Sequence, residues 1–480
     1  MRTGAEYLRS LDDGRRVFVD GELVKDVTAH PAFREAARSV ANLYDIAAAP
    51  ELRERMTYTS PKTGRPVHRS WQIPKSAADL RARRLFSETW AEATFGLIGR
   101  APDHVAGFFA GYAAVPQFFA SAGQPQFADN LVKFYEFMRD NHIYCSYAIV
   151  PPQIDRSKPA HQQSDPTLYA GVVKERDDGI IISGAQQLAT GGAISDYIHL
   201  SCIPPLPPGD DNYANCLAVP VATEGLKLYP RKPYAGAGSD YPLSSRFDES
   251  DSYVIFDNVF VPWERVFIYR NIELSRDQWR KTPSHLLGNH QAQTRYVTKL
   301  RFMAGLAQRM NEMTGNAANP AVTVMMGELA SLVSIFEAML FAHEAMGTIE
   351  DGAFWPSRTA YYAANSMQSE FNGRMLEMIR EMAGSAFITL PSSQADFANP
   401  EIAADLERYM RAAKADAKSR VKLMRLIWDF LGSEFGSRHA QYEKFYGGPS
   451  FSAKLNLYRN FDWKRAGALV DKALSLPAVE

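Results

Sequence analysis

The chain has 480 residues, of which 46% are hydrophobic and 22% charged, as in ordinary folded proteins. This length is too great for one compact core and predicts two to four structural units. The 53 basic and 54 acidic residues leave a net charge of −1, which gives no electrostatic basis for binding nucleic acid or an anionic membrane.

The apolar runs are expected to fall far short of a membrane span, and the first residues lack the apolar stretch of a signal peptide. Three scattered cysteines, Cys145, Cys202 and Cys216, offer no disulfide framework and indicate a reducing compartment. A cytoplasmic location is therefore expected. No paired Cys-x-x-Cys or His-Glu-x-x-His occurs, so no metal site is predicted. Glycine-rich nucleotide-binding motifs and the Gly-x-Ser-x-Gly motif of hydrolases are also missing from the sequence.

Residues 1–144 are expected to form a mainly helical domain. Ser76 followed by Asp79 predicts the start of a helix over residues 77–94. A second helix is predicted to begin near Pro102, and a third covers residues 127–139.

Residues 145–272 change in character and predict a central β unit. Short runs of β-branched and aromatic residues at 179–183, 217–221 and 252–261 read as strands. Clusters rich in proline, glycine and aspartate separate them and predict loops.

Residues 273–480 return to helical periodicity. Four apolar stripes predict four long amphipathic helices, and hence a bundle. The methionines in these stripes are interpreted as core residues rather than as part of a cofactor site. The stripes lie at 297–310, 325–339, 367–378 and 421–431.

The chain therefore reads as mainly α with a central β domain, and this order resembles the acyl-CoA dehydrogenase-like fold, in which the central domain is a β-barrel. Residues 97–104, Leu-Ile-Gly-Arg-Ala-Pro-Asp-His, resemble the Gly-Arg-x-Pro-Asp-Tyr motif of the 4-hydroxyphenylacetate 3-monooxygenase family, and residues 152–158 resemble its flavin loop. Further resemblances occur, in the family's order, at 242–249, 256–264, 390–397 and 445–449. The chain is identified as a member of this family of two-component phenol hydroxylases.

The resemblance implies a specific reaction. A separate NAD(P)H:flavin reductase supplies FAD as FADH2, which reacts with molecular oxygen to form a C4a-hydroperoxyflavin. The distal oxygen is then transferred to the ring carbon ortho to a phenol. Most members are homotetramers. The phenol itself, which in relatives is free, halogenated, an amino acid or tethered to a carrier, is not identified by the sequence.

The catalytic residues implied by the resemblance are Arg100, His104 and Tyr147. Arg100 would favour the phenolate, because a guanidinium is always charged and donates in a fixed fork. Relatives usually carry Tyr where this chain has His104, and His where it has Tyr147. The two residue types have thus exchanged places, which puts 4-hydroxyphenylacetate as the substrate in doubt. The alternatives are a surface ion pair for Arg100, a solvent-exposed His104 and an alignment shifted by one or two residues at Tyr147.

Flavin contacts are implied in several segments. They are Gln153, Arg156 and Ser157 in the flavin loop, Thr190 at a strand end, Arg295 in a helix, and Tyr446, Gly447, Gly448 and Ser450 near the end of the chain. The two late glycines would let backbone N–H groups approach phosphate, although a simple helix stop explains them equally well. Ser146, Ser201 and Cys202 are the implied substrate contacts, the last two in a proline-rich loop.

Other functions on the same fold fit the sequence less well, because the motifs above are not those of an acyl-CoA dehydrogenase and the three cysteines lack the spacing of iron–sulfur ligands in the first domain. An acyl-CoA dehydrogenase would need a catalytic glutamate in the bundle, and a 4-hydroxybutyryl-CoA dehydratase would need cysteine and histidine ligands for an iron–sulfur cluster. A non-enzymatic scaffold of the same fold is a further alternative, which the His104 and Tyr147 exchange would also explain.

Overall fold

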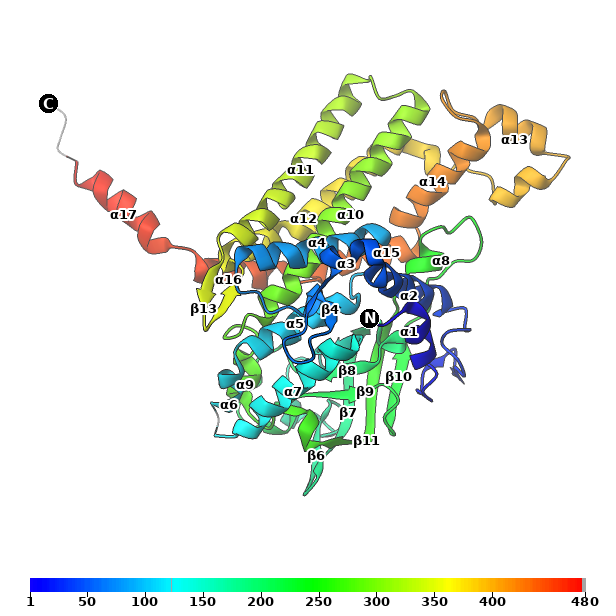
Figure 1. Cartoon of the computed structure of the whole chain (residues 1–480). Helices are drawn as coiled ribbons and strands as arrows, with labels where there is room; N and C mark the ends of the chain where they lie inside the picture. The colour runs from blue at the N-terminus through cyan, green and yellow to red at the C-terminus, as the bar shows by residue number, and fades with distance from the viewer. Residues whose placement is uncertain (122, 477–480) are drawn as a thin grey trace.

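A computed structural model describes residues 1–121 and 123–476. Helices of the N-terminal third lie at the centre of the molecule, the β-strands lie on one side of them and the long C-terminal helices on the other (Figure 1). The order of helical, β and helical units predicted from the sequence is confirmed.

The N-terminal third contains the three predicted helices, here α4, α5 and α7. Ser76 is the N-cap of α4, as predicted, and its hydroxyl accepts a hydrogen bond from the backbone N–H of Asp79. The elements of this region are α1 (Gly4–Ser10), β1 (Phe18–Val19), β2 (Glu22–Leu23), α2 (Arg34–Ala48), α3 (Arg53–Met56), β3 (Thr57–Thr59), β4 (Pro66–His68), α4 (Ala77–Ala93), α5 (Pro102–Ala114), α6 (Pro116–Ala120) and α7 (Pro125–Asn141).

The central unit consists of two four-stranded sheets. One has the order β10 (Leu226–Pro230), β11 (Asp251–Pro262), β7 (Gly179–Thr190), β6 (Gly171–Arg176), and all its neighbours are antiparallel. The other has the order β12 (Val266–Ile268), β9 (Cys216–Pro220), β8 (Tyr197–Leu200), β5 (Cys145–Ala148), in which β5 and β8 are parallel.

The expected β-barrel is wrong, because within residues 1–121 and 123–476 the two sheets do not close on each other. Beyond β5 a single bridge joins Val150 to Gln187 of β7. The chain then enters Pro151 and Pro152, which have no N–H to donate to a ladder, so pairing between the sheets stops there.

The C-terminal region contains helices at all four predicted stripes, which confirms them. They are α10 (Ser284–Thr314), α11 (Pro320–Ala345), α12 (Arg358–Ala383) and α14 (Ala417–Leu431). The region also contains short elements that no stripe predicted. These are α13 (Ala403–Tyr409), α15 (Glu434–Phe445), α16 (Ser450–Asn460), α17 (Trp463–Leu474) and the hairpin of β13 (Thr348–Glu350) and β14 (Ala353–Trp355); α8 (Ser244–Phe247) and α9 (Ile272–Asp277) precede α10.

Helix α11 corrects the expectation that no apolar run approaches a membrane span. It is 26 residues long and contains an 18-residue stretch with a mean hydropathy of 1.7, so by length and composition alone it could cross a bilayer. Leu329 and Phe336 on one flank are fully buried against the core, whereas Val324 and Ile335 on the other flank are exposed. The helix therefore carries an apolar face that the other described residues do not cover.

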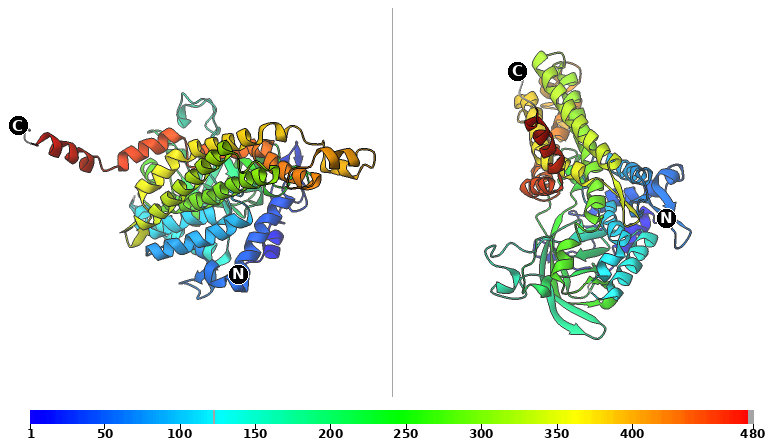
Figure 2. Two further views of the ribbon diagram at one scale, coloured as in Figure 1. Left: turned by 90° about the horizontal axis from the view of Figure 1, so that it is seen from above. Right: turned by 90° about the vertical axis from the view of Figure 1, so that its left-hand side faces the viewer.

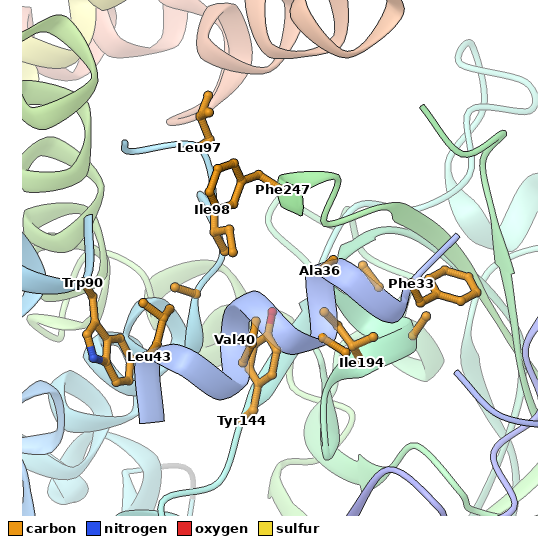
Figure 3. Packing of buried hydrophobic residues seen from close by; sticks show 14 of the residues in the cluster. Phe33, Ala36, Val40, Leu43, Trp90, Leu97, Ile98, Tyr144, Ile194 and Phe247 are labelled. Carbon is orange, nitrogen blue, oxygen red and sulfur yellow. The ribbon is translucent and has the colours of Figure 1, made fainter. Parts of the chain in front are cut away.

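The largest core cluster fixes the two segments that lead to the site. Figure 3 shows Leu43 of α2 near Trp90 and Val40 of α2 near Tyr144, and Leu97 and Ile98 belong to the same cluster. Full burial of each such side chain contributes about 1.5–3 kcal/mol. The residues just before Arg100 and just before β5 are thus held on a rigid base.

Candidate active site

The backbone at Gly99 and Arg100 is held from several sides. The Glu249 carboxylate accepts hydrogen bonds from the N–H groups of Gly99 (3.1 Å) and Arg100 (2.9 Å). The Tyr446 hydroxyl donates to the Gly99 carbonyl (2.7 Å), and the Tyr144 hydroxyl donates to the Arg100 carbonyl (2.8 Å). Such support fixes the direction in which the Arg100 side chain leaves the backbone.

The Arg100 guanidinium lies among aromatic rings. It sits 3.9 Å from the ring centre of Tyr446 and 5.0 Å from that of Tyr147, and donates to the Tyr446 carbonyl (3.2 Å). Among the described residues no carboxylate side chain forms an ion pair with it, since Glu249 pairs with Arg438 instead. The alternative of a surface ion pair is therefore wrong, and the cation is left without a fixed counter-ion.

His104 lies one helical turn further along α5 and is fully buried, so it is not the solvent-exposed histidine of the alternative. Its Nε2 is 2.5 Å from a terminal nitrogen of Arg100, and its Nδ1 is 3.1 Å from Oε1 of Gln291. Burial, and then the positive charge of Arg100, lower the pKa of His104 well below its ordinary value. The imidazole is therefore neutral.

Tyr147 joins the same cluster from strand β5. Its ring centre lies 5.6 Å from that of His104, and burial raises the pKa of its phenol, which is therefore neutral. The preceding residue, Ser146, points to the opposite face of the strand and donates to the Thr190 carbonyl (2.8 Å). The structure thus brings together Arg100, His104 and Tyr147, but it places the Ser146 hydroxyl away from them.

A cavity of about 390 Å³ opens close to the end of β5. Four of the predicted contacts line it: Gln153 and Arg156 of the flavin loop, and Ser201 and Cys202 of the proline-rich loop. Ser157 is not part of the lining; its hydroxyl and N–H bond to the Asp155 carboxylate.

An aromatic wall connects the cavity to the Arg100 cluster. The Phe108 ring lies 5.8 Å from Tyr147 and 5.5 Å from Trp279, in both cases edge to face. The indole N–H of Trp279 donates to the Cys202 carbonyl at the cavity (3.2 Å). The Arg100 cluster, whose residues do not line the cavity, is thus linked to it through Phe108 and Trp279.

Thr190 and Arg295 already have partners within the chain. The Thr190 hydroxyl donates to the Asp251 carboxylate (2.7 Å). Both terminal nitrogens of Arg295 donate to Glu443, and Lys299 donates to the same carboxylate (2.9 Å). Burial alone would raise the pKa of Glu443, but these two cations lower it to about 2. Arg295 also lies 4.6 Å from the Tyr446 ring centre.

The segment after α15 begins at the cluster and leads away from it. Tyr446 contacts Arg100, whereas Ser450 is the first residue of α16. A Cβ on Gly447 would lie 2.3 Å from the Asn365 amide, and Gly448 has φ +92°, so both positions require glycine. Helix α15 ends at Phe445, so the glycines also act as a helix stop.

Several residues around the cluster were not predicted. Glu249 lies in a recognised motif, but no rule of spacing assigns it to the backbone of Arg100. Gln291 belongs to α10 and forms hydrogen bonds with both His104 and Asp103 of α5. Only the packing of α10 against α5 brings these residues together. Asp248, next to Glu249 in the same motif, forms an ion pair with Arg231 (2.5 Å).

Comparison with known proteins supplies the family. The family model for the N-terminal part of 4-hydroxyphenylacetate 3-hydroxylase matches residues 3–268, and the model for the C-terminal part matches residues 275–475. The chain belongs to the 4-hydroxyphenylacetate 3-hydroxylase family. This confirms the resemblance stated from the motifs.

Individual relatives match along nearly their whole length. The oxygenase component of 4-hydroxyphenylacetate 3-monooxygenase from Klebsiella oxytoca is 37% identical, over 98% of this chain and 92% of its own. The oxygenase component of 4-nitrophenol 2-monooxygenase from a Rhodococcus species is 36% identical, over 93% and 86%. A crystal structure of the oxygenase component of 4-hydroxyphenylacetate 3-monooxygenase with FAD and 4-hydroxyphenylacetate matches with a TM-score of 0.93 at 33% identity, over 99% of both chains.

Proposed function

We propose that this chain is the oxygenase component of a two-component flavin-dependent phenol hydroxylase. It uses FADH2 and O2 to add a hydroxyl group ortho to the oxygen of a phenol. The observation that carries the proposal is the Arg100 guanidinium, which faces aromatic rings without a carboxylate partner. When bound, the reduced flavin supplies the activated oxygen atom, and the protein's residues bind and orient the phenol.

The side chains around Arg100 suit a phenol in its ionised form. The guanidinium binds the phenol oxygen and favours the phenolate, whose ortho carbon is richer in electrons. Tyr147 and Phe108 border the aromatic ring, and the buried setting of His104 excludes water from the reacting oxygen.

The cavity suits part of a flavin. Its volume of about 390 Å³ falls within the usual range of ligand pockets, roughly 300–1,000 Å³. Gln153 has an amide for the edge of the flavin ring, and the charges of Arg156 and Lys158 suit its pyrophosphate. Further contacts are proposed at Ser157, Thr190, Tyr446, Gly447, Gly448 and Ser450. Arg295 forms an ion pair with Glu443 and lies beside the Tyr446 ring, so we propose that it positions Tyr446 and does not itself contact the flavin.

The assembly and its partners are also proposed. The relatives are named as oxygenase components, which supports a separate NAD(P)H:flavin reductase as partner. The exposed apolar faces of α11 and α17 support a homotetramer. A cytoplasmic location agrees with three cysteines that are all free and buried.

The substrate is proposed only as a phenol. The named relatives act on 4-hydroxyphenylacetate and 4-nitrophenol, so the family accepts different para substituents. Exchange of histidine and tyrosine between positions 104 and 147 changes which hydrogen bonds the pocket offers. A panel of phenols is therefore needed.

The test supplies the purified chain with FADH2 from an NADH:flavin reductase under ¹⁸O₂ and screens phenols, measuring product and H2O2 together. At least one phenol should give a catechol that contains one ¹⁸O atom, with a matching fall in H2O2. If every phenol left the H2O2 yield unchanged and gave no oxygenated product, the scaffold alternative would replace the proposal.

A further inference from the structure

Helices α5 and α10 lie unusually close together beside the Arg100 cluster. A Cβ on Gly107 of α5 would lie 2.8 Å from the Leu287 carbonyl oxygen, and one on Gly111 would lie 2.2 Å from Ser284. On α10, a Cβ on Gly288 would lie 2.4 Å from the Phe108 ring. Only glycines allow this approach, and it brings the α10 side chain of Gln291 onto α5.

Gln291 joins two neighbouring residues of α5. Its Nε2 donates to Oδ1 of Asp103 (3.0 Å), and its Oε1 lies 3.1 Å from Nδ1 of His104. The other ring nitrogen of His104 faces Arg100. All of Asp103, His104 and Gln291 are buried, so water does not compete for these bonds.

The direction of each hydrogen bond follows from the groups at the two ends. An ionised carboxylate only accepts, so the amide nitrogen of Gln291 faces Asp103 and its oxygen faces Nδ1, which must carry the hydrogen. A guanidinium only donates, so Nε2 facing Arg100 must carry a lone pair. Both ends of the chain of bonds require the same tautomer.

We propose that Asp103 and Gln291 are positioning residues that hold His104 in its Nδ1–H tautomer, so that Nε2 accepts the proton of the bound phenol. This inference rests on the proposed function. The phenol O–H bond breaks and an N–H bond forms at Nε2, while the electron pair stays on the phenolate oxygen beside Arg100. The imidazolium then donates through Nδ1 to Gln291, whose amide is bonded to the Asp103 carboxylate.

The groups around this relay fit the assignment. Burial raises the pKa of Asp103 to about 6, so its carboxylate is mostly ionised at neutral pH. Arg83 faces Asp103 from α4, while Tyr147 of β5 and Tyr446 after α15 face His104. Arg100 is the charge nearest to Nε2. Arg100 donates to Nε2, so the phenol must displace this bond, and the phenolate in contact with both groups would then offset the two positive charges.

The first test locates the proton without reference to activity. Nitrogen NMR of the full protein, labelled with ¹⁵N in its histidine rings, should show Nδ1 of His104 protonated and Nε2 bare, with the signal assigned by its loss in His104→Gln. A protonated Nε2 would overturn the inference even if phenols are hydroxylated. The expected tautomer would stand even if no phenol were hydroxylated, so failure of the proposed function is distinguishable.

The second test is a double-mutant cycle that uses the tyrosine of relatives. In Asp103→Asn the new amide can donate to Gln291, whose own amide can then reverse and no longer select the Nδ1–H tautomer. Product formed per NADH should therefore fall about 10-fold in the wild-type background. A tyrosine has no ring tautomer, so the same change in a His104→Tyr background should cost less than about twofold. Equal losses in both backgrounds would mean that Asp103 acts structurally. If the double variant does not fold, the NMR measurement decides alone.

Discussion

At position 100 the decisive property is a positive charge that forms no ion pair with a carboxylate of residues 1–121 or 123–476. The cation is oriented by its own backbone, which Glu249 and Tyr446 hold, and it lies against the rings of Tyr147 and Tyr446. Truncation of this arginine removes both the positive charge and the oriented N–H donors of the guanidinium. In the proposed function, this guanidinium is the group expected to bind the phenol oxygen.

We therefore expect Arg100→Ala to retain reaction of the reduced flavin with O2 but to release H2O2 in place of product. Product per NADH should fall about 100-fold, which corresponds to about 2.7 kcal/mol of lost stabilisation. Arg100→Lys should form an intermediate amount of product per NADH, because lysine keeps the positive charge but lacks the forked donor geometry of the guanidinium. Arg81→Ala, on the exposed face of α4, is the matched control and should couple normally. Normal coupling in Arg100→Ala would remove this residue from the mechanism.

The same residues show how far the sequence predicts the site. Motif order was sufficient to bring Arg100, His104 and Tyr147 together, although they come from two elements. It did not indicate that the Ser146 hydroxyl bonds the Thr190 carbonyl on the other side of β5 from Tyr147, since neighbours on a strand point to opposite faces. Gln291 was out of reach, because its role depends on how closely α10 approaches α5 and no local pattern encodes that distance.

At the scale of elements, long helices with one apolar face were predictable and short or uncovered ones were not. The stripes of α10, α11, α12 and α14 were found because each buries a face in the core. Helices α16 and α17 are mostly exposed in the single chain, so no core selects their pattern. The β-barrel failed for a local reason, namely two prolines that follow β5.

The close approach of α5 and α10 can be tested through its glycines. Gly107→Ala should destabilise the protein by about 1–3 kcal/mol, because the added methyl group meets the backbone of α10. Gly305 is the matched control on α10, because nothing lies within 4 Å of a Cβ added there. Gly305→Ala should stabilise the folded protein by about 0.4–1 kcal/mol. Thermal unfolding of the two variants would show shifts of opposite sign. Equal shifts would mean that the helices are not in close contact.

At the scale of the whole molecule, α17 indicates an assembly. The helix projects from the body of the chain (Figures 1 and 2), and its apolar residues Leu469 and Leu474 are 69% and 81% exposed. A chain ending at Asp462 should form a smaller assembly than the full-length protein by light scattering, because contacts to neighbouring copies are lost. A chain ending at Leu476 keeps α17 and should assemble as the full chain does. An unchanged number of subunits in the shorter chain would show that α17 does not make the subunit contacts.

The protein as a whole should be sensitive to mild acid, because burial holds eight of its ten histidines neutral. Their pKa values are lowered, to about 3 for His142 and about 4 for His199 and His285. An unfolded histidine titrates near 6.5, so below that pH the unfolded state binds more protons and stability falls as pH falls. For each such histidine, the free energy of unfolding falls by about 1.4 kcal/mol for each pH unit between its unfolded and folded pKa.

Direct measurement of proton uptake checks this count. Unfolding by urea at pH 5.5 in weak buffer should take up several protons, because an unfolded histidine is about 90% protonated there whereas the buried histidines are neutral in the folded state. His199→Gln should take up about one proton fewer, because His199 is buried on β8 and bonds only the Leu217 carbonyl (3.1 Å). Uptake of fewer than about two protons by the wild-type protein would mean that the buried histidines are already charged in the folded state, and with them His104, whose neutrality the proton transfer from the phenol requires.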